Sequence, residues 1–322
     1  MSRFIVRRLL QAIPLLIVIS LLTFLIVEIA PGDASQMYIN PESGTDPAYI
    51  AQVRRSLGLD EPVYVRYVNW LGKTLSGDLG FSFRTRRPVA LEVGDRLPNT
   101  LLLGSASLLL SFVIAIPIGV VSALKRYTFI DYFLSTVALA GVSIPIFWVA
   151  LLLVQVFAIQ LDVLPASGMR NVRESYTGFP AVFDVLQHML LPMITLSLAQ
   201  IAGWSRYQRS ALLNVLGQDF IRTARGKGLT ERRVLGVHAL RNSLIPMVTL
   251  VGISVPTVVT GAFITESIFS WPGIGRMGVD AVVGRDYPVI MAVTMMSALL
   301  IVIGSLLADL AYAWVDPRIR YE

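Results

Sequence analysis

Two short glycine-containing motifs are the first candidates for chemistry, because such motifs can hold the phosphates of a nucleotide. Gly72-Lys73-Thr74 has the end of a phosphate-binding loop, G-x-x-x-x-G-K-[ST], but Tyr67 stands where that loop needs its first glycine. A tyrosine there removes the turn that brings backbone N–H groups to the phosphates. The motif therefore argues against ATP binding by this chain.

Gly273-Ile-Gly275-Arg-Met-Gly278 fits the dinucleotide pattern G-x-G-x-x-G. That pattern binds a pyrophosphate only between a strand and a helix of a βαβ unit. Here a long apolar stretch lies on either side of it, so we expect a tight turn between two membrane spans. Trp271, just before it, would lie at the level of the lipid headgroups.

Side chains for hydrolysis or metal binding are equally scarce. The sequence has no cysteine, which excludes thiolate metal ligands, and His188 and His238 lie too far apart in the sequence to suggest a shared site. Glu266 and Asp309 stand within apolar stretches but near their ends, where structural pairing is expected. The sequence predicts a protein that is not an enzyme and has no metal or cofactor of its own.

The composition indicates a membrane protein. The chain of 322 residues is 55% hydrophobic and 15% charged, whereas soluble domains are about a quarter charged. So little charge cannot cover a soluble surface, which places much of this surface in lipid. The formal net charge of +6 then fits basic cytoplasmic loops rather than nucleic-acid binding.

Six apolar stretches reach the roughly 20 residues that a helix needs to cross a bilayer. The first is too long for a signal peptide, so we interpret it as an uncleaved anchor. Pro145, beside small residues, is expected to kink the third span. The expected spans are Leu9–Ala30, Thr100–Leu124, Tyr132–Ile159, His188–Leu213, Leu244–Thr265 and Val289–Val315.

Lysine and arginine are distributed unevenly among the connections. They gather at the N-terminus, between the second and third spans, between the fourth and fifth spans, and in the C-terminal tail. Because cytoplasmic loops of membrane proteins are enriched in these residues, both termini are predicted to lie in the cytoplasm.

The stretch 31–98 separates the N-terminal anchor, 1–30, from the five spans within 99–322. Asp46-Pro47 can begin a helix that Gly58 ends, and Asp60-Glu61-Pro62 can begin another. We expect two short amphipathic helices on the outer face of the membrane. The apolar face of the second would consist of Val63, Tyr67, Trp70 and Leu71.

The connection between the fourth and fifth spans, about 215–241, has the signals of two short helices. Asp219 can cap the first, Gly228 can end it in a left-handed conformation, and Thr230 can cap the second. Two interpretations remain open: a basic loop at an anionic lipid leaflet, and a shaped docking element for another protein. Small residues would line the corner (Thr223, Ala224, Gly226 and Gly228), ringed by Arg222, Arg225 and Lys227.

Several motifs along the chain are shared with one family of transport proteins. On these motifs the chain resembles, over nearly its whole length, the first permease subunit of the dipeptide, oligopeptide and nickel family of binding-protein-dependent ABC importers. The motifs are Arg7-Arg8-Leu-Leu, Ala30-Pro31-Gly32-Asp33, Leu57-Gly58-Leu59-Asp60, Trp70-Leu71-Gly72, Gly77-Asp78-Leu79-Gly80-Phe81-Ser82, Leu97-Pro98-Asn99-Thr100 and Glu266-Ser-Ile-Phe-Ser-Trp271-Pro272-Gly273-Ile-Gly275.

The signature that such importers share is a Glu-Ala-Ala stretch, a glycine, and a closing Ile-x-Leu-Pro. Ala224, Gly228 and Leu240 match it, whereas Arg222 and Arg241 stand at the positions of its glutamate and proline. The resemblance implies an all-α polytopic protein of the type I importer permease fold, with six transmembrane helices and a helical extracytoplasmic insertion after the first span.

The resemblance also implies a location in the inner membrane of a bacterium or archaeon, and a set of partners. These are a second homologous permease, two cytoplasmic ATPase subunits that bind ATP and Mg²⁺, an extracytoplasmic substrate-binding protein and membrane lipids, with no nucleic acid. Trp271, Pro272, Gly273 and Arg276 would meet the binding protein. The residues that would couple to the ATPase are Asp219, Arg222, Thr223, Ala224, Arg225, Gly226, Lys227, Gly228 and Leu229.

The cargo stays open among dipeptides, oligopeptides, nickel chelates and glutathione, as does a homodimer or a heterodimer of permeases. Asn99, Ser143 and Gln200 are candidates for the translocation path, with hydrogen bonds between packed helices as the alternative. A membrane-embedded enzyme and an ion-coupled carrier are two further classes. The absence of a catalytic constellation and of a ladder of buried acids argues against them.

Overall fold

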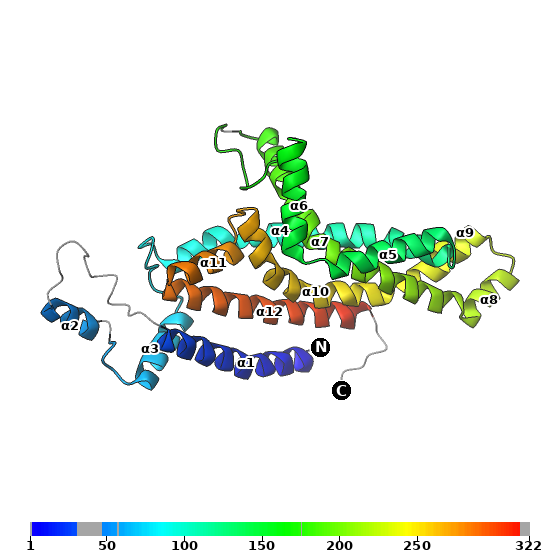
Figure 1. The fold of residues 1–322 in the computed structure, drawn as a ribbon. Coiled ribbons are helices and arrows are strands. Elements are labelled where there is room, and N and C mark those ends of the chain that lie inside the picture. Colours follow the sequence, from blue (N-terminus) through cyan, green and yellow to red (C-terminus); the bar gives the residue numbers. More distant parts are fainter. Residues whose placement is uncertain (1, 31–46, 57, 175, 316–322) are drawn as a thin grey trace. The chain divides into compact units, whose positions relative to one another are not determined.

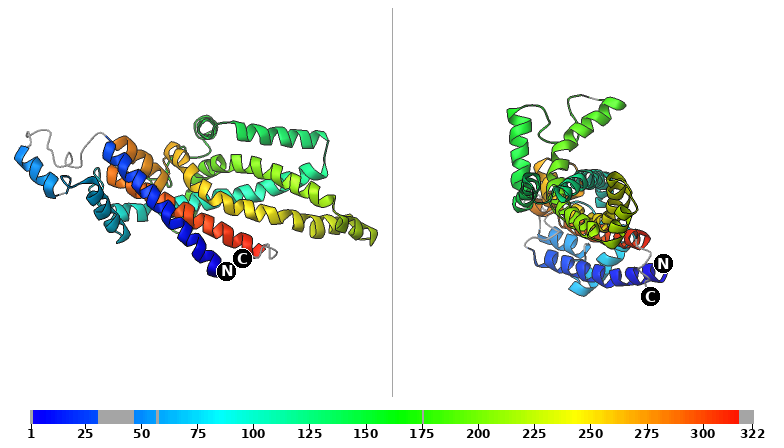
Figure 2. Two further views of the ribbon diagram at one scale, coloured as in Figure 1. Left: turned by 90° about the horizontal axis from the view of Figure 1, so that it is seen from below. Right: turned by 90° about the vertical axis from the view of Figure 1, so that its right-hand side faces the viewer.

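The computed structural model describes residues 2–30, 47–56, 58–174 and 176–315, and these residues form helices and connections without a strand. They fall into two compact units. Of the described residues, one unit contains 99–174, 176–272 and 300–315, and the other contains 2–30, 47–56, 58–98 and 273–299. Figures 1 and 2 show the fold in three views.

The unit that begins at Asn99 contains the long helices that position the candidate site. In it α7 contacts α5, α6 and α10, and Figures 1 and 2 show α4, α5, α7 and α10 side by side. The bounds are α4 (Val89–Leu124), α5 (Phe129–Ser143), α6 (Ile146–Leu153), α7 (Phe179–Leu216), α8 (Asp219–Gly226), α9 (Glu231–Arg233) and α10 (Arg241–Ile268), with π-helical turns at Val154–Gln160 and Val234–Leu240.

Small and hydroxyl side chains let α4 and α7 approach closely. A Cβ atom added to Gly119 of α4 would lie 2.6 Å from the carbonyl oxygen of Ser205 in α7. Two turns earlier the Ser197 hydroxyl donates to the carbonyl of Ser107 across the same interface, at 3.0 Å. Close backbone approach with hydrogen bonds between helices is typical of packing in lipid, where dispersion replaces the hydrophobic effect between helices.

Five helices of the described residues are long and apolar enough to cross a membrane, and the count rises to six if one bent pair is a single span. Five expected spans match α1, α4, α7, α10 and α12. All five helices begin earlier than expected, most clearly α4 at Val89 instead of Thr100, α7 at Phe179 instead of His188 and α1 at Ser2 instead of Leu9. In α1 and α4 the added turns carry charged residues, which continue the helix beyond its apolar stretch.

The third expected span, Tyr132–Ile159, is wrong as a single straight helix. Its two halves, Phe129–Ser143 and Ile146–Gln160, are bent by 103°. Proline lacks the N–H that would continue the hydrogen-bond ladder, and it disfavours a helical conformation for the residue before it. Pro145 therefore ends one helix and caps the next, so the expected kink is present but much sharper.

The second unit contains the anchor helix α1 (Ser2–Ile29) and the two helices of the expected outer segment, α2 (Pro47–Ser56) and α3 (Val63–Leu75). It also contains α11 (Ile274–Gly284) and the first part of α12 (Tyr287–Val315). Pro47 is the first residue of α2, and Gly58 after its end has φ of +67°, as the sequence predicts. The cap expected at Asp46 lies outside the described residues.

Helix α3 packs against α1 through part of its expected apolar face. The ring of Phe24 in α1 lies 5.5 Å from that of Tyr67 and 5.8 Å from that of Trp70, between ring centroids. Arg66 Nη1 donates to Glu28 Oε1 at 2.5 Å beside this cluster. Val63, expected on the same face, is 42% exposed, so the contact is made by the middle of α3.

The Gly119 contact gives a direct test of the α4–α7 packing. Gly119→Ala should lower the thermal midpoint of the detergent-purified chain, because an overpacked methyl group costs about 1–3 kcal/mol. Gly94→Ala in the same helix is the matched control, since a Cβ there meets nothing within 4 Å. Equal midpoints for the two variants would contradict the close approach.

Candidate functional site

The connection between α7 and α10 forms a helix, a glycine corner and a second helix, as predicted. Figure 1 shows α8 and α9 beyond the end of α7. The cap expected at Asp219 is wrong, because Asp219 is the first helical residue and Gln218 takes the cap position without a side-chain hydrogen bond. Asp219 instead lies 3.3 Å from Arg222 in an ion pair. A carboxylate in the first turn also faces the positive end of the helix dipole.

Gly228 forms the corner with the left-handed conformation that the sequence predicts. Its φ is +75°, its N–H donates to Arg225 O at 2.9 Å, and the next N–H, of Leu229, donates to Ala224 O. These bonds satisfy carbonyl groups at the end of α8. Thr230 takes the cap position of α9 as expected, although its side chain makes no cap hydrogen bond.

One face of α8 is buried and fixes the segment to the bundle. Ile221 is fully buried, and Ala224, expected among the small residues lining the corner, is buried as well. Leu229 packs against the same cluster. Ala224 and Leu229 therefore hold the corner in place from inside. The cluster consists of Ala123, Leu212, Ile221, Ala224, Val234 and Ala239.

The opposite face of α8 is open. Thr223, Gly226 and Lys227 are exposed, and a Cβ added to Gly226 would meet nothing within 4 Å. Phe220 is 43% exposed on the same short helix, and the sequence analysis missed it. An aromatic ring beside cations is a typical anchor for a groove on another protein, so this face has the chemistry of a docking surface.

Arg225, one of the residues expected to couple to the ATPase, forms an ion pair within the corner and keeps an exposed side chain. Its Nη2 and Nε donate to the two carboxylate oxygens of Glu231, at 2.6 and 3.2 Å. This hydrogen bonding raises the pKa of the Arg225 guanidinium above its usual value, so it stays charged. The pair joins α8 to α9 across Gly228.

A buried ion pair joins three helices above the corner. Arg209 of α7 donates to both oxygens of Asp131 in α5, each at 2.7 Å. Asp131 also accepts from the Ser122 hydroxyl of α4 and from the N–H of Tyr127. The sequence analysis missed this cluster, although an acid in the first turn of an apolar helix was a signal that a partner had to be near.

Helices α7 and α10 are also joined directly. Gln208 Nε2 donates to Ser243 Oγ at 2.9 Å, and both side chains are buried. Together with the apolar cluster under α8, this bond ties the corner to the two helices that it connects.

Trp271 occupies a different place from the one expected. It is fully buried, and its indole Nε1 donates to Asn99 O at 3.0 Å. Asn99 Nδ2 donates in turn to Pro272 O at 2.9 Å. Trp271 therefore offers no surface to lipid headgroups or to a partner protein, and Asn99, a candidate for the translocation path, instead holds this turn.

The tight turn expected at the glycine motif comes just before it, where Ser270 has φ of +50°. Gly273 caps α11, and the remaining motif residues form the first turns of that helix. Pro272 and Arg276 keep partly exposed surfaces, and Arg276 lies 3.8 Å from Asp280. Of the residues expected to meet a binding protein, these two present surface.

Ser143 and Gln200, the other two candidates for the translocation path, lie in different environments. Ser143 is exposed at the bend, and its hydroxyl donates to Leu139 O at 2.9 Å. Gln200 is partly buried, and its Oε1 has no hydrogen-bond partner among the described residues. Glu266 is buried and accepts from Thr100 Oγ1 at 2.7 Å, which is the structural pairing expected for an acid near a span end. Within the described ranges no cluster of three or more His, Cys, Asp or Glu residues could hold a metal ion.

Comparison with known proteins decides the family. The model for the binding-protein-dependent transport system inner membrane component matches residues 115–321, and the model for the N-terminal part of that component matches residues 1–104. The chain belongs to this family. It is therefore a membrane component of a transport system, as the motifs led us to expect. The corner at Gly228 lies within the match over residues 115–321.

Curated relatives match over the full length. The chain is 44% identical to the oligopeptide transport system permease protein AppB of Bacillus subtilis, with complete coverage of both chains. It is 40% identical to the dipeptide transport system permease protein DppB of Escherichia coli K12, again with complete coverage of both. A glutathione transport system permease protein of another Escherichia coli strain is 37% identical over both complete chains.

The solved structures agree on the fold. An inward-facing MetNI methionine ABC transporter structure contains a chain that matches with a TM-score of 0.55 at 18% identity, covering 70% of this permease and 96% of that chain. A second crystal form gives a TM-score of 0.57. The expected permease fold is thus confirmed.

The Asp131–Arg209 pair generates a stability test. Asp131→Leu leaves the Arg209 guanidinium without its partner and should destabilise the permease by about 2–3 kcal/mol. The double variant Asp131→Leu/Arg209→Met removes both charges and should recover most of the lost thermal midpoint. A double variant as unstable as the sum of its singles would show that the two side chains do not act together.

Proposed function

We propose that this chain is one permease subunit of an ATP-driven peptide importer and forms half of its translocation path. The cargo class is supported by full-length relatives named for oligopeptides, dipeptides and di/tripeptides. Glutathione, the cargo in the name of a further relative, is itself a small peptide. ATP and Mg²⁺ would be bound by two separate cytoplasmic ATPase subunits, and the second half of the path would come from a homologous permease.

The observation that supports coupling is the two-sided construction of α8. Ile221 and Ala224 fix one face to the bundle, while Gly226 and the following Lys227 are exposed and Phe220 is 43% exposed at the flank of the buried face. A helix of this kind can enter a groove on the ATPase and still transmit force, because it cannot slide on its own bundle. The exposed residues Asp219, Arg222, Thr223 and Gly228 complete the proposed docking surface.

The proposed motion is a rigid-body tilt of permease helices driven by closure of the ATPase pair. ATP binding would bring the docking helices of the two permeases together. Because Gln208–Ser243 and Asp131–Arg209 join the helices above the corner, the displacement would reach α5, α7 and α10 at once. The path would then open on the outer side, beneath a substrate-loaded binding protein.

On the outer side, the proposed contact with the binding protein involves Pro272 and Arg276, with Trp271 and Gly273 supporting the turn from inside. The segment 31–98 would lie outside the cytoplasm, between the anchor 1–30 and the permease core 99–322. Both termini would lie in the cytoplasm, because the basic connections alternate with less basic ones.

Gly226 gives the sharpest test of docking. Gly228 is a weaker choice, because its φ of +75° strains any side chain even in the free subunit. Gly226→Leu fits the free permease and would fill only the space that the ATPase needs. We expect peptide uptake by membrane vesicles carrying the full complex to fall at least about tenfold, as for loss of ~1.4 kcal/mol of binding.

The matched control is Gly94→Leu, another helical glycine with open space around it. It should leave uptake unchanged, and immunoblots should show both variants in the membrane at the normal level. Normal uptake in Gly226→Leu would contradict docking at α8. Uptake that continues in the absence of the ATPase subunits, driven by an ion gradient, would contradict the proposed function itself.

The proposed orientation can be tested by single cysteines, since the chain has none of its own. Thr223→Cys on α8 should react with a membrane-impermeant maleimide in everted vesicles but not in spheroplasts. Ser76→Cys, at the exposed end of α3, should show the reverse pattern. Labelling of Thr223→Cys from the outside would rule out the assigned orientation.

A further inference from the structure

The second half of α7 presents an unusual face for a membrane-spanning helix. Its exposed positions recur about every three or four residues, and apart from Tyr207 they are small or polar instead of large and apolar. Lipid-facing surfaces consist of large apolar side chains, whereas polar groups within spans face other helices or water-filled cavities. The exposed residues are Ala199, Gly203, Arg206, Tyr207, Ser210 and Asn214.

Helix α5, packed beside α7, shows the opposite character. Its exposed side chains include Ile130, Phe133, Val137 and Val142, which suit lipid or an apolar partner helix. The contrast indicates that the exposed stripe of α7 belongs to a water-accessible surface. In a permease whose path lies between two subunits, such a surface is expected along the path.

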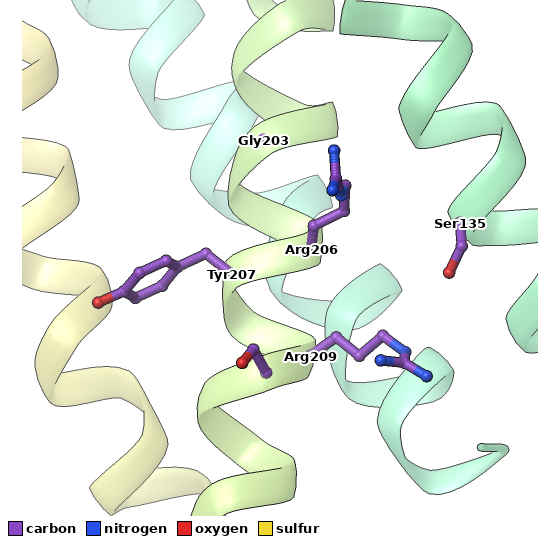
Figure 3. Close-up of a pocket in the computed structure, with 6 residues that line it drawn as sticks. Ser135, Gly203, Arg206, Tyr207 and Arg209 are labelled. Atoms are coloured by element: carbon purple, nitrogen blue, oxygen red, sulfur yellow. The ribbon is translucent and has the colours of Figure 1, made fainter.

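A pocket of about 440 Å³ lies on this stripe. Figure 3 shows the side chains of Arg206 and Arg209 extending from α7 toward the side where Ser135 of α5 lies, while Tyr207 points the other way. Gly203 forms part of the wall, and a Cβ added there would meet nothing within 4 Å. The absence of a side chain at Gly203 leaves the space next to Arg206 open.

The pocket carries one net positive charge. The charge of Arg209 is balanced by Asp131, which accepts two hydrogen bonds from it. Arg206 is exposed and has no ion pair with the other described residues. Ser135 and Ser210 also line the space, and the Ser135 hydroxyl already donates to Asp131 Oδ1 at 3.5 Å. The Arg206 guanidinium with the Ser210 hydroxyl beside it matches a carboxylate, which accepts a forked pair of hydrogen bonds.

We propose that Arg206 receives the terminal carboxylate of the peptide as it crosses the membrane. This inference rests on the proposed function, because it names the group of the cargo that the path recognises. The terminal carboxylate is present in peptides of every sequence, so a single cation on the wall can serve cargo of varied side chains. Exposure of Arg206 to water keeps this contact weak enough for release, as a transport path requires.

A lipid phosphate is the competing occupant, since basic pockets between spans can bind anionic headgroups. Its acyl chains would need a groove of long apolar side chains continuing from the pocket. The α7 wall instead continues as Ala199 and Gly203 in one direction and as Ser210 and Asn214 in the other. The stripe therefore favours the carboxylate of a water-borne substrate.

The test uses Gly203→Cys, which places a single thiol beside Arg206 in a chain without other cysteines. The complete importer is placed in phosphatidylcholine nanodiscs, and the thiol of this chain is treated with an anionic or a cationic methanethiosulfonate reagent. We expect the ratio of the anionic to the cationic rate to be about tenfold higher than in Gly203→Cys/Arg206→Gln, from the field of one nearby charge. Ala199→Cys, farther along the stripe, should show a smaller effect.

Substrate protection then identifies the occupant. A dipeptide with a free terminal carboxylate, at millimolar concentration, should slow the labelling of Gly203→Cys, and the same dipeptide with an amidated terminus should not. In Gly203→Cys/Arg206→Gln both dipeptides should have the same small effect. This pattern, together with the charge preference, would support the proposal.

Three results would overturn it. A thiol at position 203 that is inert to both reagents would place the stripe against lipid or a partner helix. Equal protection by the free and the amidated dipeptide would show that Arg206 does not recognise the carboxylate. Loss of labelling on adding phosphatidylglycerol, without protection by either dipeptide, would assign the pocket to a lipid. Uptake by the unsubstituted importer, measured in proteoliposomes, separately tests the proposed function.

Discussion

The burial of Ile221 and Ala224, on the inner face of α8, is the contact on which the proposed coupling depends. Because this face is buried, α8 has two properties together that an isolated loop cannot have. It has an exposed surface for a partner, and it has a fixed position on the bundle. The Arg225–Glu231 pair links α8 to α9, and Gly228 permits the reversal of the chain. Without the buried face, work done on α8 would only bend a loop, and no motion would reach the spans.

Elsewhere in the bundle, the buried polar groups hold neighbouring helices and turns together. Glu266 accepts from Thr100 next to the turn that Trp271 and Asn99 hold together, and Asp131 is surrounded by donors from three segments. Burying a carboxylate is costly unless hydrogen bonds replace its water. These complete arrangements explain why acids within spans do not imply catalysis here. Arg206 differs from them because it is exposed and lies beside open space.

Much of the fold could be predicted from the sequence, because the hydrocarbon thickness imposes a minimum length on each apolar helix. The left-handed Gly228 and the helix start at Pro47 were predictable for a local reason, the backbone geometry of glycine and proline. The 103° bend at Pro145, the burial of Trp271 and the inward face of Ala224 were not. Each of these depends on which neighbouring helix packs against the residue, and a single sequence does not specify that. The Asp131–Arg209 pair was missed for the same reason, since its two residues come from different helices.

The length of α7 has a mechanical consequence. Its 38 residues extend for roughly 57 Å, about twice the thickness of a hydrocarbon core. Since α8 follows the end of α7, the proposed docking helix is attached to the end of one long, continuous arm. A tilt of about 10° around a fulcrum in the bilayer moves the end of a 25 Å arm by roughly 4 Å. A small displacement of α8 would thus correspond to an even smaller displacement of α7 near the fulcrum, within the bilayer. The force there would be larger in the same proportion.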